Sequence, residues 1–134
     1  MINALPISLS GLNAASRQAQ AAASNIANAG TSGAISEENG PPAYQAQDVL
    51  LSSTVISSSG SGVNASLVPR DPSTLVAFDP DSPFADSEGL VSVPNVDVAE
   101  ELVNLKLAEL SYKANISVIE TQNDLSEELL DILS

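Results

Sequence analysis

Residues 95–134 read NVDVAEELVNLKLAELSYKANISVIETQNDLSEELLDILS and predict one long helix at the carboxyl end of the chain. Pro94 precedes the segment, and Asp97 with Glu100 three residues later resembles a capping box. Apolar side chains then recur at intervals of four and three residues, which places them on one side of a helix.

The apolar side chains of this helix form two adjacent stripes. The first consists of Val98, Leu102, Leu105, Tyr112, Ile116 and Ile119, with the charged Glu109 at one position of the same spacing. The second consists of Val103, Leu107, Leu110, Ala114, Val118, Leu125, Leu129 and Ile132. Because two stripes make a face wider than one partner helix covers, we expect burial on more than one side, as in a multi-helix bundle or tube. The alternative is burial of this helix against the middle of the same chain.

Residues 5–29 predict a second helix near the amino end, with Pro6 in the first turn, where proline is tolerated. Asn28 and Gly30 are typical of its end. Small and apolar side chains follow the same four-three spacing at Leu5, Leu9, Leu12, Ser16, Ala19, Ala23 and Ile26. An ordinary amphipathic helix in a monomeric core is the alternative. We expect contacts with other chains instead, because an Ala-rich helix by itself buries little apolar area.

The middle of the chain, residues 30–94, differs from both ends in composition. It holds every glycine except Gly11 and every proline except Pro6. Short strands are predicted at 44–56, 63–68, 75–78 and 90–93. A flexible connection is expected at 57–62, where the sequence reads SSSGSG, and a mobile segment at 30–43.

These patterns predict a mainly α fold in which long amino- and carboxyl-terminal helices form a coiled-coil-like pair around a small, irregular, β-containing middle region. Three parts follow: residues 1–29 and 95–134 as the helices, and residues 30–94 between them. Only two Phe, two Tyr and no Trp are present, so the core is thin and depends on aliphatic side chains. Such a chain gains stability from neighbouring subunits.

Charge and composition exclude several classes of function. The net charge is −13, with only four basic side chains, so the chain cannot neutralise the phosphates of nucleic acids or bind anionic membranes. Acidic faces that meet basic faces on other subunits are one reading of this charge, and simple solubility is the other. The amino terminus lacks a basic region followed by an apolar run, and thus does not read as a conventional signal peptide.

No pattern in the sequence predicts catalysis or a bound cofactor. The chain has no Cys and no His, which removes thiolate chemistry and the usual general base. The best metal candidate is the acidic loop with Asp79, Asp81, Asp86 and Glu88. Pro80 and Pro83 break the spacing that a calcium loop needs, so a solvated loop is expected there.

Two segments resemble known proteins. Residues 10–33, SGLNAASRQAQAAASNIANAGTSG, resemble the amino-terminal signature of bacterial flagellar axial proteins, including Asn25 and Asn28. Residues 71–121 look like the flagellar basal-body rod proteins of the C type, through positions such as Pro94, Asn95, Tyr112 and Asn115.

This resemblance implies a structural subunit of the proximal rod, the hollow shaft that crosses the periplasm and transmits torque. Export through the flagellar type III apparatus without a cleaved signal peptide is implied too. The expected partners are other copies, other rod proteins, and ring or export-gate components, with no small-molecule substrate. The residues expected at subunit interfaces are Leu5, Leu9, Leu12, Ala19, Ala23, Ile26, Val98, Leu102, Leu105, Tyr112, Ile116 and Ile119.

Two alternatives remain open at this point. The first is another flagellar axial protein or a coiled-coil adaptor with similar terminal helices. The second is a small enzyme or metal-binding protein that uses the acidic loop.

Overall fold

A computed structural model describes every residue except 1–3, 37, 39, 58, 59 and 134; the side chains of 55–61 and 133 are not described either. The elements follow in the order α1 (Ala4–Asn28), β1 (Gln47–Ser57), β2 (Gly60–Pro69), β3 (Thr74–Phe78), β4 (Leu90–Pro94) and α2 (Val98–Leu133). Both predicted helices and all four predicted strands are present. Neither helix in the described residues carries an apolar stretch that could cross a bilayer.

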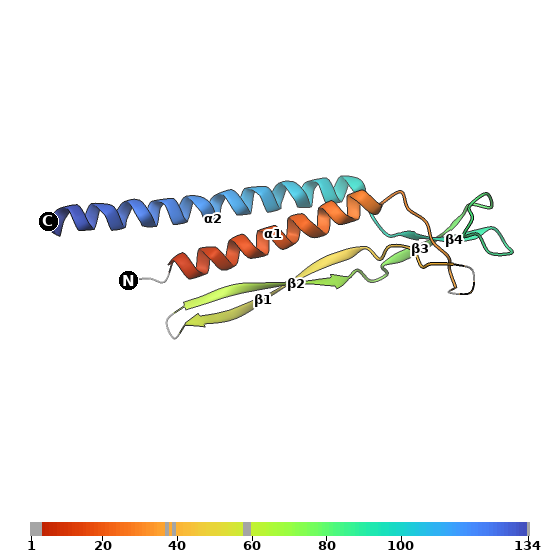
Figure 1. The fold of residues 1–134 in the computed structure, drawn as a ribbon, viewed down its shortest axis with the longest axis horizontal. Coiled ribbons are helices and arrows are strands. Elements are labelled where there is room, and N and C mark those ends of the chain that lie inside the picture. The colour runs from red at the N-terminus through yellow and green to blue at the C-terminus, as the bar shows by residue number, and fades with distance from the viewer. Residues whose placement is uncertain (1–3, 37, 39, 58–59, 134) are drawn as a thin grey trace.

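The molecule is elongated and built in layers (Figure 1). α1 lies between α2 on one side and the β1–β2 hairpin on the other, and the two helices run antiparallel. Gly11 faces Asn115, and Asn25 contacts Glu101. The small β3–β4 sheet lies at the end of the molecule where α1 finishes and α2 begins (Figure 1).

α1 is covered on two sides because its side chains are small. Its buried residues are Ser8, Ala14, Ala15, Ala21, Ala22 and Asn25. Alanine lets the helix backbone approach its neighbours closely, and at Gly11 an added Cβ would lie only 2.5 Å from Asn115 Oδ1. The expectation that the Ala-rich helix needs contacts with other chains stays a prediction. It did not anticipate that the hairpin covers the side of α1 that α2 leaves open.

α2 begins as the sequence predicts. Asp97 Oδ1 accepts hydrogen bonds from the backbone N–H groups of Ala99 at 2.9 Å and Glu100 at 3.3 Å. This carboxylate satisfies donors that have no partner within the helix, and its charge suits the positive end of the helix dipole. α2 packs mainly on α1 and not on the middle region, so the alternative of burial against the middle of the chain is wrong.

The two antiparallel sheets fix the middle region. β1 pairs with β2 from Gln47 opposite Pro69 to Ser57 opposite Gly60, and β3 pairs with β4. The expected flexible connection was placed too widely, because Gly60–Gly62 belong to β2 and only residues 58 and 59 lie outside the described chain. Val63 N donates a hydrogen bond to Ser10 Oγ at 3.1 Å, which ties the hairpin to α1.

Residues 30–43, expected to be mobile, are held at two points. Gly33 and Ser92 exchange backbone hydrogen bonds of 2.9 Å in both directions, and Ala34 N donates to Pro41 O. Gly33 allows a close crossing of two backbones, since an added Cβ would lie 2.2 Å from Ala43 N. The chain after α1 is thereby attached to the β3–β4 sheet.

The core is thin, in agreement with the composition. Apart from Val91, Pro94, Gly33 and Gly89, the buried apolar residues in the described chain are all alanines. Phe78 is 71% exposed, and many leucines of α2 face solvent. The fold of a single chain therefore depends on close backbone packing and polar contacts more than on large apolar side chains.

Replacing Ala22 with leucine tests this close packing. Ala22 is 1% exposed, and overpacking a dense interior costs typically about 1–3 kcal/mol. We expect the free energy of unfolding of the purified chain, measured in urea, to fall by that amount. The matched control is Ala23→Leu at the exposed neighbouring position, which should change it by less than about 0.5 kcal/mol. Equal losses in the two variants would contradict the packing described.

Candidate functional site

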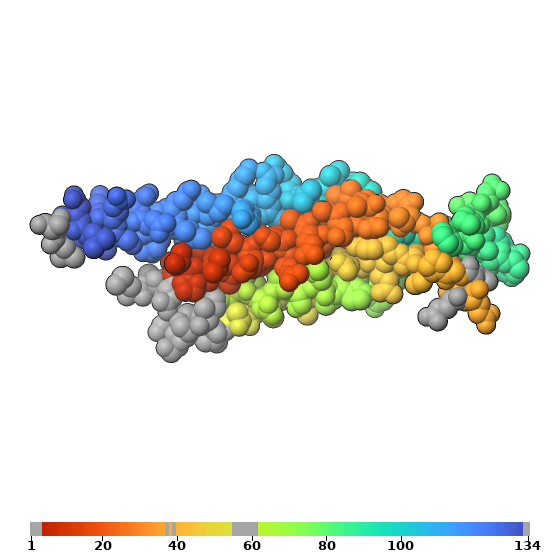
Figure 2. All heavy atoms as spheres, viewed as in Figure 1, coloured from red at the N-terminus to blue at the C-terminus, as the bar shows by residue number. Residues whose placement is uncertain are grey.

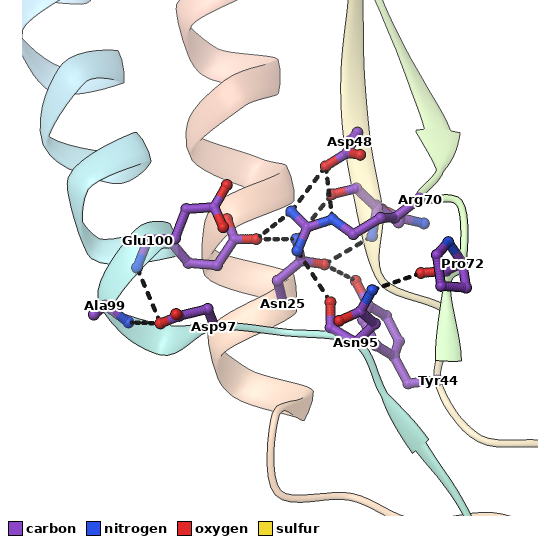
Figure 3. A network of polar contacts seen from close by, with 11 residues as sticks. Asn25, Tyr44, Asp48, Arg70, Pro72, Asn95, Asp97, Ala99 and Glu100 are labelled. Atoms are coloured by element: carbon purple, nitrogen blue, oxygen red, sulfur yellow. Dashed lines mark hydrogen bonds and ion pairs between the residues drawn. The ribbon is translucent and has the colours of Figure 1, made fainter. Parts of the chain in front are cut away.

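A buried polar cluster joins α1, α2 and the hairpin (Figure 3). At its centre lies Asn25, which is 0% exposed. Its Nδ2 donates to Gln47 O and to Glu101 Oε1, both at 2.8 Å. Its Oδ1 accepts hydrogen bonds from Gln47 N at 2.9 Å and from the Tyr44 hydroxyl at 3.1 Å. All four hydrogen-bonding positions of the carboxamide are therefore occupied.

Glu101 brings a carboxylate from the first turns of α2 into this interior, where it is 2% exposed. Its Oε1 accepts hydrogen bonds from Asn25 and, at 2.7 Å, from Arg70 Nη2. An isolated charge at such a position would be costly, and the Arg70 guanidinium offsets that cost. Among the described residues, every buried side-chain nitrogen or oxygen has a hydrogen-bond partner.

Arg70 follows β2 and connects three segments. Its Nε and Nη2 donate to Asp48 Oδ1 at 3.0 and 2.8 Å, and its Nη1 donates to Asn95 O at 3.0 Å. The hydrogen bonds to Asp48, and then to Glu101, raise the pKa of the guanidinium above its ordinary value despite partial burial. Arg70 therefore remains charged and links β1 with the start of α2.

Asn95 and Tyr44 complete the connections of the cluster. Asn95 Nδ2 donates to Pro72 O at 2.9 Å, and Asn95 N donates to Ser73 O at 3.0 Å. Burial raises the pKa of the Tyr44 phenol above its ordinary value, so the hydroxyl keeps the proton that it donates to Asn25. We call the residues Asn25, Tyr44, Asp48, Arg70, Asn95 and Glu101 the polar clamp.

The structure separates the family-motif residues into different roles. Asn25 and Asn95 belong to the polar clamp, and Pro94, which directly precedes Asn95 in the sequence, is buried. Asn28 ends α1, where its Nδ2 donates to Ser24 O and its carbonyl accepts from Thr31. Asn115 lies against Gly11, in the contact between the helices.

Sequence reasoning did not find the clamp as a unit. Arg70, Asp48, Tyr44 and Glu101 were not predicted as site residues. One signal could have pointed to Arg70, since it is the only basic residue between Arg17 and Lys106 in a chain rich in acids. A lone cation in such a context is typical of a specific ion pair.

The predicted interface residues fall into two groups. Exposed in the single chain are Leu5, Leu9, Ala23, Val98, Leu102 and Tyr112. Partly buried are Leu12, Ala19, Ile26, Leu105, Ile116 and Ile119. Their role in contacts between subunits stays a prediction. The second stripe of α2 is also exposed, and large exposed apolar patches are typical of protein interaction sites. Figure 2 shows α2 lying along one edge of the molecule.

Two acidic features have local explanations. Asp86 Oδ1 accepts hydrogen bonds from Glu88 N at 2.8 Å and Leu90 N at 2.9 Å, so this carboxylate stabilises the turn of its own loop. No group of side chains suited to a metal ion occurs in the described part of the chain. On α2, Lys106 and Lys113 both pair with Glu109 and lower the pKa of its carboxyl to about 2.

Comparison with known proteins places this architecture in a class. Residues 87–132 match the family model described as the flagellar basal body rod FlgEFG protein C-terminal, a segment that includes β4 and nearly all of α2. The class is thus that of the rod and related axial proteins of the bacterial flagellum.

Relatives along almost the full length identify the family. The chain is 35% identical to the flagellar basal-body rod protein FlgC of Salmonella typhimurium, over 90% of this chain and 89% of that protein. It is 36% identical to FlgC of Yersinia enterocolitica over 93% and 92%, and 29% identical to FlgC of Bacillus subtilis over 97% and 96%. The chain belongs to the FlgC family of flagellar basal-body rod proteins, which are structural proteins.

Asn25→Asp tests the polar clamp with almost no change in shape. It removes both donors of the carboxamide and sets a carboxyl beside Glu101, where Nδ2 and Oε1 are now 2.8 Å apart. Breaking a buried pair in this way costs about 3–5 kcal/mol, which we expect as the loss of unfolding free energy in urea at pH 7. Asn28→Asp at the end of α1 is the isosteric control, and its loss should stay below about 2 kcal/mol.

The pH dependence of the Asn25→Asp loss gives a second readout. A carboxyl that shares a site with Glu101 takes up a proton, so its pKa rises above the usual value of about 3.9. A carboxyl whose pKa is higher in the folded than in the unfolded chain stabilises the fold at pH values below its unfolded-state pKa. That stabilisation is lost as the pH rises through its folded-state pKa. The deficit should therefore be smaller at pH 4 than at pH 7. A deficit that does not change with pH would show that the two carboxyls do not interact.

Proposed function

We propose that this chain is a subunit of the proximal part of the flagellar rod, where it assembles through α1 and α2 into a hollow shaft that transmits torque. The observation that carries the proposal is the distribution of apolar surface. Of the described side chains of α2, only Glu101 and Ala108 are fully buried, whereas Val98, Leu102 and the large aliphatic side chains of the second stripe are exposed to solvent. A stable subunit with this surface needs neighbours that cover it.

The antiparallel packing of α1 on α2 supports an assembly of helix pairs. The hairpin packs against α1 on the side away from α2. The outer face of α2 and the leucines near the start of α1 are exposed to solvent. In a helical assembly, each contact joins two different faces, one on each subunit. The two exposed helix surfaces therefore suit contacts with the preceding subunit and with the following subunit. Coiled-coil-like pairing of α1 with α2 is part of this proposal.

The polar clamp has a mechanical role in this assembly. It fixes the β3–β4 end and the hairpin relative to the helices through hydrogen bonds that depend on direction. Apolar contacts alone would permit small rotations, whereas the four bonds of Asn25 permit one arrangement. A shaft that transmits torque requires that its outer and inner parts turn together.

The remaining parts of the proposal concern partners and route. The partners are other copies of the chain, other rod proteins, and ring or export-gate components of the basal body that contact the middle region. Export proceeds through the flagellar type III apparatus without cleavage of a signal peptide. A thin core that unfolds readily supports this route, because a narrow export channel requires an unfolded chain.

Leu102→Asp tests the proposed function. Leu102 is 54% exposed in the single chain, so the free energy of unfolding of the purified variant should lie within about 0.5 kcal/mol of that of the parent. In the rod the same carboxylate would enter a dry helix contact, which is costly without a partner. We expect loss of motility in soft agar and loss of complete basal bodies by electron microscopy in a strain that carries only this variant.

Two further variants make the Leu102 result specific. Leu102→Met keeps an apolar side chain and should preserve motility. Ile116→Asp should also abolish assembly, but since Ile116 is partly buried beside α1, this variant loses stability as a purified chain too. Normal basal bodies with Leu102→Asp, or normal motility after deletion of the gene, would rule out the proposed role.

A further inference from the structure

The last part of α2 extends beyond the rest of the folded chain (Figure 1). In the antiparallel register given by Gly11 with Asn115 and Asn25 with Glu101, Ala4 lies opposite Gln122. Residues 123–132 therefore lie past the described start of α1, and every one of them is exposed. The large apolar side chains there reach exposures of 51% at Leu125, 57% at Leu129, 68% at Leu130 and 78% at Ile132.

This extension is amphipathic. Leu125, Leu129 and Ile132 follow the four-three spacing and form one apolar seam that continues from Val118. At about 100° per residue, the five carboxylates of residues 118–132 fall within about 100° of the helix circumference, on a separate face that adjoins the seam. These carboxylates are Glu120, Asp124, Glu127, Glu128 and Asp131. A partner that covers the seam thus meets negative charge along one border.

The position of the charge in the helix makes it unfavourable within the chain. Carboxylates near the carboxyl end of a helix oppose its dipole, and α2 has no basic residue in its last turn. There is no Lys or Arg in the sequence after Lys113. Cations from outside the chain would relieve both the dipole and the mutual repulsion of these carboxylates.

A second copy of this chain is a poor source of those cations, because it carries only four basic side chains against 17 acidic ones. Arg70 is bound in the polar clamp, and Lys106 and Lys113 both pair with Glu109. Of the four basic side chains, all in the described chain, this leaves Arg17, which donates to Gln20 at 3.2 Å. Two copies also bring a net charge of −13 each to the contact. Like charges side by side are a recognised means of rejecting a partner.

We propose that residues 118–132 of α2 pack against a helix of a different protein, one with an apolar seam flanked by Lys or Arg, and not against a copy of this chain. This inference rests on the proposed function, since it specifies which kind of rod neighbour covers this part of α2. The apolar seam provides the contact area, and the carboxylate face selects the cationic partner and its orientation.

The test places a photocrosslinking amino acid, p-benzoylphenylalanine, at Leu129 in the full chain within purified basal bodies. The same substitution at Leu102 is the positive control for incorporation into the rod. Mass spectrometry identifies the crosslinked peptide. A helical segment of another protein with Lys or Arg beside the crosslinked residue supports the inference. A crosslink to a copy of this chain, a crosslink to a segment without basic residues, or no crosslink at Leu129 overturns it.

The two proposals fail in different ways. If Leu102 crosslinks within basal bodies and Leu129 does not, the chain is a rod subunit and only the partner inference is wrong. If the unsubstituted chain is itself not found in basal bodies although the purified chain is folded, the proposed function fails and the inference fails with it.

Charge reversal gives an independent test. Glu127→Lys with Glu128→Lys should lower the number of complete basal bodies at least about tenfold, since close interfacial charge pairs contribute more than 1.4 kcal/mol. The purified variant should be at least as stable as the parent, because the new cations suit the helix dipole. Glu127→Asp with Glu128→Asp keeps both negative charges at the same positions and should leave basal bodies within about twofold. Equal effects, or none, would overturn the inference.

Discussion

The buried carboxylate of Glu101 is the constraint around which the rest of this fold is organised. A charge in that position is tolerated only with Arg70 from the end of β2 and Asn25 from α1 beside it. To bring those groups together, the hairpin must cover α1 and α2 must begin where α1 ends. The clamp therefore fixes the relative positions of three elements that large apolar side chains, scarce in this core, do not fix. Its main contribution is geometric specificity, and its net contribution to stability is small.

Small residues in α1 make this arrangement possible. Helix and hairpin both approach α1 closely because alanine and serine occupy its buried positions, so one helix serves as the centre of a three-layer structure. Because small residues fill the interior, the large aliphatic side chains of α2 lie on the surface. Within a monomer that distribution is unfavourable. In the assembly proposed above, the exposed leucines would form the interface, and each subunit would gain part of its stability from its neighbours.

Much of the architecture could be predicted from the sequence because its signals are local. The four-three spacing gives both helices, Asp97 gives the start of α2, and short β-rich runs separated by glycine and proline give the four strands. The flagellar family could also be recognised, from Asn25 and Asn28 together with the segment around Pro94 and Asn95. These features depend on neighbours within a few residues, and for that reason they can be read without knowledge of the fold.

The sequence by itself thus determined the elements, the acidity and the family, while the tertiary structure decided which surfaces are inside. The stripe through Leu5 and Leu9 is largely exposed to solvent, whereas the alanines beside it are buried. The reason is that the hairpin and α2 together cover the alanine-containing faces of α1. The clamp likewise depends on contacts between residues such as Asn25 and Glu101, 76 positions apart. No local periodicity encodes such a contact, since it exists only when the packed layers bring a donor, an acceptor and a counter-charge to one point.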